Sequence, residues 1–161
     1  MSNAQAYDRA LRPLLGQATG YARALLRSRA DAEDAVQAAA LKGWERLAQY
    51  DDTQPFKGWW FGILRNICLD QLRRTNVRRT EPLDGHDPAA PTEQAPLDWR
   101  QLDDAMRRLS GPHQEILRLK YFGELKYDEL AVALSIPKGT VMSRLHLARK
   151  ALAAEYTKEI P

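Results

Sequence analysis

The residues with the most suggestive chemistry lie near the C-terminal end of the sequence. Cations, hydroxyl groups, a methionine and a histidine recur there on what would be the outer side of one helix. They are Lys138, Thr140, Met142, Ser143, Arg144 and His146, followed by Arg149 and Lys150. Such groups hydrogen-bond base edges in the DNA major groove and neutralise phosphates. The pattern is typical of a DNA-reading helix, and it also fits a helix that only packs against its neighbours.

The elements that must position these residues are two short helices, predicted over 127–134 and 137–153. Pro137 suits the first turn of the second helix, where its missing N–H is not needed. A small shared core is expected from Leu130, Ala131, Leu134, Ile136, Val141, Leu145 and Ala148. The arrangement is that of a helix-turn-helix, in which the second helix enters the major groove.

The rest of the chain also predicts helices, so the expected fold class is all-α. Apolar residues recur at three and four spacing, and no run alternates with period two. Pro13 interrupts the first helical stretch at 5–28, and Asp31 is the expected N-cap of the second helix. That second helix would bury Val36, Ala40, Trp44 and Leu47. Further helices are predicted from about Pro55 to Arg74, with Trp60, Ile63 and Ile67 inward, over 102–109, and from Pro112 to before Gly123.

Residues 76–97 differ from the rest, because they hold four of the nine prolines and no hydrophobic period. We interpret them as a flexible linker between two small helical domains, 1–75 and 98–157. Residues 1–80 contain 13 Lys and Arg against 8 Asp and Glu, and residues 99–161 contain 11 against 8. Residues 81–98 contain 5 Asp and Glu and no cation. Two basic units around an acidic strip suit a polyanionic partner.

Other classes of function have little support in the sequence. No Ser/His/Asp set, carboxylate pair or glycine-rich phosphate loop is apparent, so we predict no enzyme activity and no cofactor. Three histidines far apart make a metal site improbable, and Cys68 is the single cysteine and is expected to be buried. No apolar run is long enough to span a membrane, and no signal peptide is evident, so we expect a cytoplasmic protein.

Two segments resemble region 4 of bacterial sigma factors of the extracytoplasmic-function (ECF) group. They are Leu109–Gly123 and Ile136–Leu152. The resemblance implies reading of the −35 promoter element by Lys138, Thr140, Ser143, Arg144 and Arg149, and more weakly by His146 and Lys150. Met142 and Leu147 depart from the family, which often has a basic residue at each of these positions.

The segment Asp31–Leu47 resembles sigma region 2, in the helix that binds the clamp of the large subunit of core RNA polymerase. Four of its residues, Asp34, Gln37, Leu41 and Glu45, share one stripe beside the predicted core stripe. Polar residues around an exposed leucine suit a docking face. Without the resemblance, the same stripe would simply be a solvated surface.

The segment 56–74 resembles the part of region 2 that melts and reads the −10 element. Melting requires aromatic faces for unstacked bases and cations for the backbone. The candidates are Lys57, Trp59, Phe61, Arg65, Asn66, Arg73 and Arg74. Trp60 is expected in the core, with Trp59 or Phe61 more exposed. The loop 50–55 matches in position the family's loop that captures a flipped base.

The resemblance implies a two-domain sigma factor that binds core RNA polymerase and promoter DNA and is a probable target of an anti-sigma factor. Two alternatives remain open at this point. One is a sigma-like decoy that binds an anti-sigma protein without binding DNA. The other is a plain helix-turn-helix repressor, which would not need the polymerase-docking face.

Overall fold

The computed structural model describes residues 1–79 and 97–159, and every regular element within these ranges is helical. The elements in chain order are α1 (Asn3–Leu11), η1 (Arg12–Leu14), α2 (Leu15–Leu26), α3 (Arg29–Glu45), η2 (Leu47–Gln49), α4 (Phe56–Arg79), α5 (Leu97–Arg107), α6 (Gly111–Tyr121), α7 (Tyr127–Leu134) and α8 (Lys138–Glu159). The predicted all-α fold is confirmed. Most of the predicted linker, residues 80–96, lies outside the described residues.

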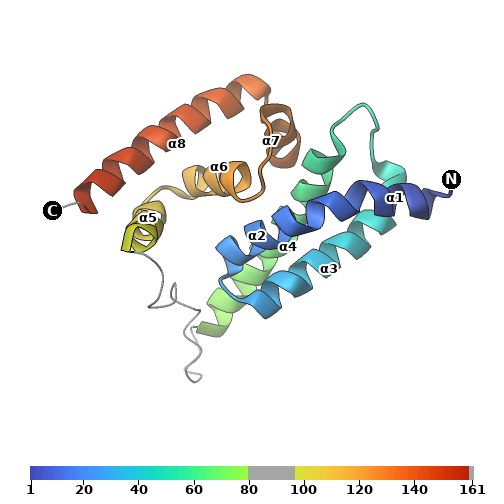
Figure 1. The fold of residues 1–161 in the computed structure, drawn as a ribbon, viewed down its shortest axis with the longest axis horizontal. Helices are drawn as coiled ribbons and strands as arrows, with labels where there is room; N and C mark the ends of the chain where they lie inside the picture. Colours follow the sequence, from blue (N-terminus) through green and yellow to red (C-terminus); the bar gives the residue numbers. More distant parts are fainter. Residues whose placement is uncertain (80–96, 160–161) are drawn as a thin grey trace.

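Helices α1–α4 form an N-terminal bundle, and α5–α8 form a C-terminal unit that lies along one side of it (Figure 1). Within the bundle, α2, α3 and α4 pack on one another through fully buried alanines. Side chains this small let helix backbones approach closely, and α3 contributes Ala32, Ala35 and Ala39 to this contact. Alanine also has the highest helix propensity, so the same residues favour the helix and its packing.

The tightest contact in the bundle is at Gly43 on α3. A Cβ atom at this position would collide with the Tyr7 hydroxyl and lie 2.9 Å from Cδ1 of Trp60. That hydroxyl donates a hydrogen bond of 2.6 Å to the carbonyl oxygen of Ala40, which ties α1 to α3. Gly43 is therefore required by the space that Tyr7 and Trp60 fill.

Helix α4 carries the centre of the core. Trp60, Phe61, Leu64 and Cys68 have no exposed surface. Trp60 faces α3 at Gly43, whereas the Phe61 ring lies 5.9 Å from the Tyr21 ring of α2. One hydrophobic cluster continues from these residues into Ile116, Leu117, Leu130 and Leu145 of the C-terminal unit. The two units thus share a core.

The helix-turn-helix prediction agrees with the structure of the C-terminal unit. Helix α7 spans the predicted residues 127–134, and Leu130 of α7 and Val141, Leu145 and Ala148 of α8 are all buried. The turn uses Ser135 at φ 55°, and the amide of Ile136 donates to the carbonyl oxygen of Ala131 at 3.0 Å. This bond satisfies a carbonyl group that the end of α7 would otherwise leave free.

Two expectations about the N-terminal bundle need correction, and a third is confirmed. The N-cap of α3 is Ser28 and not Asp31, since the Ser28 side chain accepts a hydrogen bond from the Asp31 amide at 3.2 Å. Trp44 is 43% exposed instead of buried, because Gly43 beside it occupies the inward position. The break predicted at Pro13 is confirmed as the 3₁₀ turn η1 between α1 and α2.

The surroundings of Cys68 make its reactivity testable. Burial in the apolar core raises the pKa of its thiol to about 12. The thiolate is the reactive form, and almost none is present at pH 8, far below that pKa. We expect iodoacetamide at pH 8 to leave Cys68 unmodified in the native protein and to modify it readily in urea. Rapid modification of the native protein would contradict the burial.

The packing at Gly43 predicts a stability difference between two glycine substitutions. Gly43→Ala would force a methyl group into Tyr7 and Trp60 and should lower the free energy of unfolding by about 1–3 kcal/mol. Gly16→Ala is the matched control, because nothing lies within 4 Å of a Cβ at this helical position. It should raise the free energy of unfolding by roughly 0.5–1 kcal/mol. Urea unfolding followed by circular dichroism measures both, and equal effects would refute the packing argument.

Candidate nucleic-acid and polymerase interface

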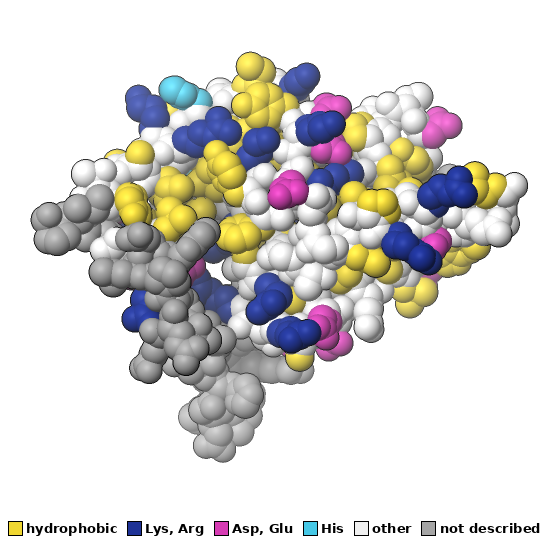
Figure 2. Space-filling model, in the orientation of Figure 1, with side chains coloured by type: hydrophobic (Ala, Val, Ile, Leu, Met, Phe, Trp, Pro, Cys, Tyr) yellow, Lys and Arg dark blue, Asp and Glu magenta, His cyan; other side chains and the backbone are white. Residues whose placement is uncertain are grey.

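The outer face of α8 presents the residues predicted to read the −35 element. Figure 2 shows basic, histidine and hydrophobic side chains together over this part of the molecule. The side chains of Lys138, Ser143, His146 and Lys150 are exposed, and those of Thr140 and Arg144 are partly exposed. The opposite face of the helix holds the buried Val141 and Leu145. The structure therefore brings the predicted set together on one surface.

Arg149 is held in place by an aromatic partner that sequence reasoning did not identify. Its Nε donates to the Tyr121 hydroxyl at 2.8 Å, and its guanidinium lies 5.8 Å from the centre of the Tyr121 ring. The hydrogen bond to Tyr121 raises the pKa of Arg149 above its ordinary value. A long, flexible cation is thereby oriented, which lowers the entropy lost when it meets a phosphate.

The predicted polymerase-docking residues share an exposed face of α3. Asp34, Gln37, Leu41 and Glu45 are all exposed, and Leu41 is 61% exposed. Trp44 lies on the same helix three residues beyond Leu41 and adds a second large apolar group. Its ring lies 5.7 Å from that of Tyr7 and is therefore held by packing. Trp44 was missed because its position matched the core stripe.

Trp59 belongs to an aromatic cluster at the start of α4. Its ring lies 4.9 Å from that of Tyr50 and 5.7 Å from that of Phe56. The Asp51 carboxylate accepts from the Thr53 amide at 2.9 Å and from its hydroxyl at 2.7 Å, and these bonds lower the pKa of Asp51. The loop before α4 is thus folded on itself and ends against partly exposed aromatic rings.

Two of the predicted −10 residues, Asn66 and Arg73, line a groove between α3 and α4. The groove has a volume of about 320 Å³ and is lined by Lys42, Arg46, Ile63, Asn66, Ile67, Leu69, Asp70 and Arg73. Asp70 pairs with Arg73 at 3.2 Å at one end. Lys42 and Arg46 were not predicted, because these two cations and Arg73 converge here only when α3 and α4 lie side by side. Arg74 is also exposed on α4.

The other three members of the −10 set face the C-terminal unit instead. Phe61 is fully buried, which corrects the expectation that it could be exposed. The Lys57 amine donates to Oε1 of Gln17 at 2.7 Å and to the carbonyl oxygen of Glu124 at 3.0 Å. Arg65 forms an ion pair with Glu115 of α6. Burial of the Lys57 amine removes it from water, and this desolvation lowers its pKa.

Glycines on α4 allow α7 to pack directly on this face. A Cβ at Gly58 would lie 2.6 Å from the carbonyl oxygen of Glu129, and one at Gly62 would lie 3.4 Å from that of Ala133. The two backbones are therefore nearly in contact. Because α7 is the first helix of the helix-turn-helix, that unit covers part of the helix predicted to read the −10 element.

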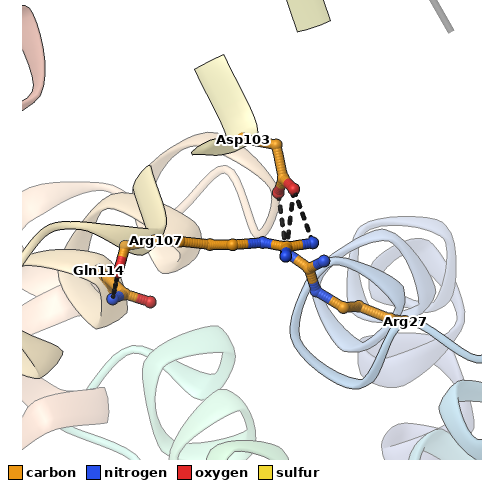
Figure 3. A network of polar contacts seen from close by, with 4 residues as sticks. All are labelled: Arg27, Asp103, Arg107 and Gln114. Carbon is orange, nitrogen blue, oxygen red and sulfur yellow. Dashed lines mark hydrogen bonds and ion pairs between the residues drawn. The ribbon is translucent and has the colours of Figure 1, made fainter. Parts of the chain in front are cut away.

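A second tie between the units joins α2 to α5 (Figure 3). Asp103 accepts from Arg27 through both carboxylate oxygens, at 2.9 and 3.1 Å, and from Arg107 at 3.0 Å. Gln114 donates to the carbonyl oxygen of Arg107 at 3.2 Å. Ion pairs with both partners partly buried are stronger than exposed ones, so Asp103 anchors α5 to the bundle.

A helical bundle joined to a helix-turn-helix unit is the arrangement expected of a bacterial transcription-initiation factor of the sigma type. The comparisons with known proteins agree. Residues 10–78 match the family model for Sigma-70 region 2, and residues 99–152 match the model for Sigma-70 region 4. The chain belongs to the ECF sigma factors of the sigma-70 family, and it acts as an alternative sigma factor in transcription initiation.

Individual relatives support this assignment. The chain is 33% identical to ECF RNA polymerase sigma factor SigL of Mycobacterium tuberculosis over 82% of its own length and 78% of the relative. It is 26% identical to ECF RNA polymerase sigma factor SigW of Bacillus subtilis, over 76% and 73% of the two chains.

The fold also resembles solved sigma factors. RpoE of Bartonella quintana, in complex with the anti-sigma factor NepR, has a TM-score of 0.71 at 24% identity and covers 95% of this chain and 98% of that one. CnrH, in complex with the cytosolic domain of CnrY, has a TM-score of 0.67 at 20% identity, covering 95% and 88%.

From the close contact between α4 and α7, we predict that one methyl group added at Gly58 separates the two units. Gly58→Ala would press on the Glu129 carbonyl, and the backbone cannot yield without moving α7. We expect the radius of gyration from small-angle X-ray scattering to rise, with helical content unchanged. Gly16→Ala should leave the radius unchanged. An unaltered radius for Gly58→Ala would show that the contact is not the one that holds the units together.

Proposed function

We propose that the chain divides promoter recognition between two surfaces. The exposed face of α8 reads the −35 element, and α4 with the groove beside it binds the melted −10 element. Asp34, Gln37, Leu41 and Glu45, extended by Trp44, dock on the clamp of core RNA polymerase. The units responsible are residues 1–75 and 98–157.

The observation that carries the −10 assignment is the groove between α3 and α4. Lys42, Arg46 and Arg73 supply positive charge, and Asn66 supplies an amide that hydrogen-bonds bases or phosphates. Ile63, Ile67 and Leu69 supply an apolar lining. A basic groove with stacking surfaces nearby is the arrangement that binds single-stranded nucleic acid. The aromatic rings of Trp59 and Tyr50, packed on each other at the start of α4, offer such a surface.

Full use of α4 requires that the C-terminal unit moves away. Lys57 and Arg65 are engaged by Glu124 and Glu115 in the structure, and α7 covers the helix at Gly58. In this proposal, promoter DNA replaces these contacts when core RNA polymerase holds the two units apart. The groove side of α4 remains open in both arrangements.

Further partners and the cellular setting belong to the same proposal. The solved relatives are bound to the anti-sigma factor NepR and to the cytosolic domain of CnrY, and we propose that an anti-sigma factor also controls this chain. No helix within 1–79 or 97–159 is long and apolar enough to cross a membrane. The protein would act in the cytoplasm, by binding alone, without a catalytic step.

Transcription in vitro tests the proposal as a whole. Genomic DNA fragments would be transcribed by core RNA polymerase with and without this protein, and RNA 5′ ends would be sequenced. We expect new start sites that share two upstream elements. The absence of both new starts and core binding would instead favour the sigma-like decoy and refute the docking face. Core binding without new starts would point to a missing activator or an unsuitable template.

Two variants separate the roles of the surfaces in that assay. Arg144→Ala should weaken promoter binding by about 1–3 kcal/mol and relax the preference at one base pair of the −35 element, as expected for a lost base contact. Leu41→Glu should instead reduce binding to core polymerase without changing the preferred sequence among residual starts. Interchanged effects would contradict the assignment of α8 and α3.

A further inference from the structure

Met142 is an exposed apolar residue in the N-terminal half of α8. It is the fifth residue of the helix, in the half that meets base edges in a helix-turn-helix. Its side chain is 54% exposed, although two cations share its side of the helix: Lys138, four residues before it, and Arg149, seven residues after it. A single exposed methionine would need no explanation on an ordinary surface. On a surface built for a polyanion it can contribute only through an apolar contact.

The spacing of the neighbours defines what Met142 would touch. Met142, His146 and Arg149 follow one another at four and three residues, so they form one stripe along α8. Met142 and Arg149 are separated by about 10.5 Å along the axis, at ~1.5 Å per residue. Arg149 is fixed by Tyr121 at the far end of this stripe. If Arg149 binds a phosphate of the DNA backbone, Met142, near the N-terminal end of α8, lies at the level of the base edges.

The major groove offers one apolar feature for direct readout, the 5-methyl group of thymine. Methionine suits such a contact, because its unbranched thioether chain adapts its shape to the surface it meets. We propose that Met142 is a specificity-determining residue that reads a thymine methyl group in the −35 element. This inference rests on the proposed function of α8 and adds the identity of one base that it prefers.

Replacement of thymine by deoxyuridine tests the contact, because it removes the methyl group and leaves the hydrogen-bonding groups unchanged. The −35 thymines of a promoter identified by 5′-end sequencing would be replaced one at a time. Binding of the holoenzyme, assembled from core polymerase and the full chain, would then be measured. We expect one replacement to weaken binding about two- to fivefold, the scale of one buried methyl group.

Three protein variants assign that loss to a residue. With Met142→Ala, the thymine and deoxyuridine promoters should bind equally. Leu147→Ala is the matched control, since Leu147 is 55% exposed on the same helix but five residues further from its N-terminal end. It should keep the discrimination. Met142→Leu, which retains an apolar side chain, should restore most of it.

Each other result overturns the inference. Equal binding of all promoters by the natural chain would show that no methyl group is read. Discrimination that persists in Met142→Ala, or that is lost in Leu147→Ala instead, would assign the contact to another residue. Failure of the unmodified holoenzyme to select any promoter would refute the proposed function of α8 and this inference with it. Selection with no methyl effect would refute the inference alone.

Discussion

The structure depends on the close approach of α4 to neighbours on two sides. On one side Gly43 lets Trp60 lie against α3, and on the other Gly58 lets the backbone of α7 reach α4. Trp60 and Phe61 are adjacent in sequence, and Trp60 lies against α3 while Phe61 is covered by Tyr21 of α2 and by Gly123 of the C-terminal unit. The bundle and the helix-turn-helix are therefore joined through the residues that also centre the core.

This arrangement divides the cations of α4 into two groups. Lys57 and Arg65 are paired with the C-terminal unit, whereas Arg73 lies in the open groove with Lys42 and Arg46. The division follows from helical geometry, because each step of eight residues turns about 80° around a helix with a period of about 3.6. Arg65 therefore lies about 80° from Lys57, whereas Arg73 lies about 160° from it, on the opposite side of α4. The groove remains accessible while the opposite side is covered.

The sequence was sufficient to predict the helices and the surface of α8, because both depend on local periodicity. Residues 127–134 and the core of Leu130, Val141 and Leu145 followed from spacing alone. Contacts between distant segments could not be predicted in this way. Phe61 was expected to have an exposed position, yet Tyr21 and Gly123 cover it from other elements. Tyr121 holds Arg149, and Arg46 lines the groove, only because the fold brings together helices that are far apart in sequence.

The ion pair between Arg65 and Glu115 has a consequence for how ionic strength acts on the protein. A cation that is free before it meets DNA releases about 0.9 counterion per phosphate, which makes binding steeply salt-dependent. To make the proposed −10 contact, Arg65 must first leave a carboxylate, and the separated charges then attract ions of their own. The net ion release for this contact is therefore smaller. A bacterium whose internal salt concentration rises would lose less affinity at such a promoter contact than the number of cations alone implies.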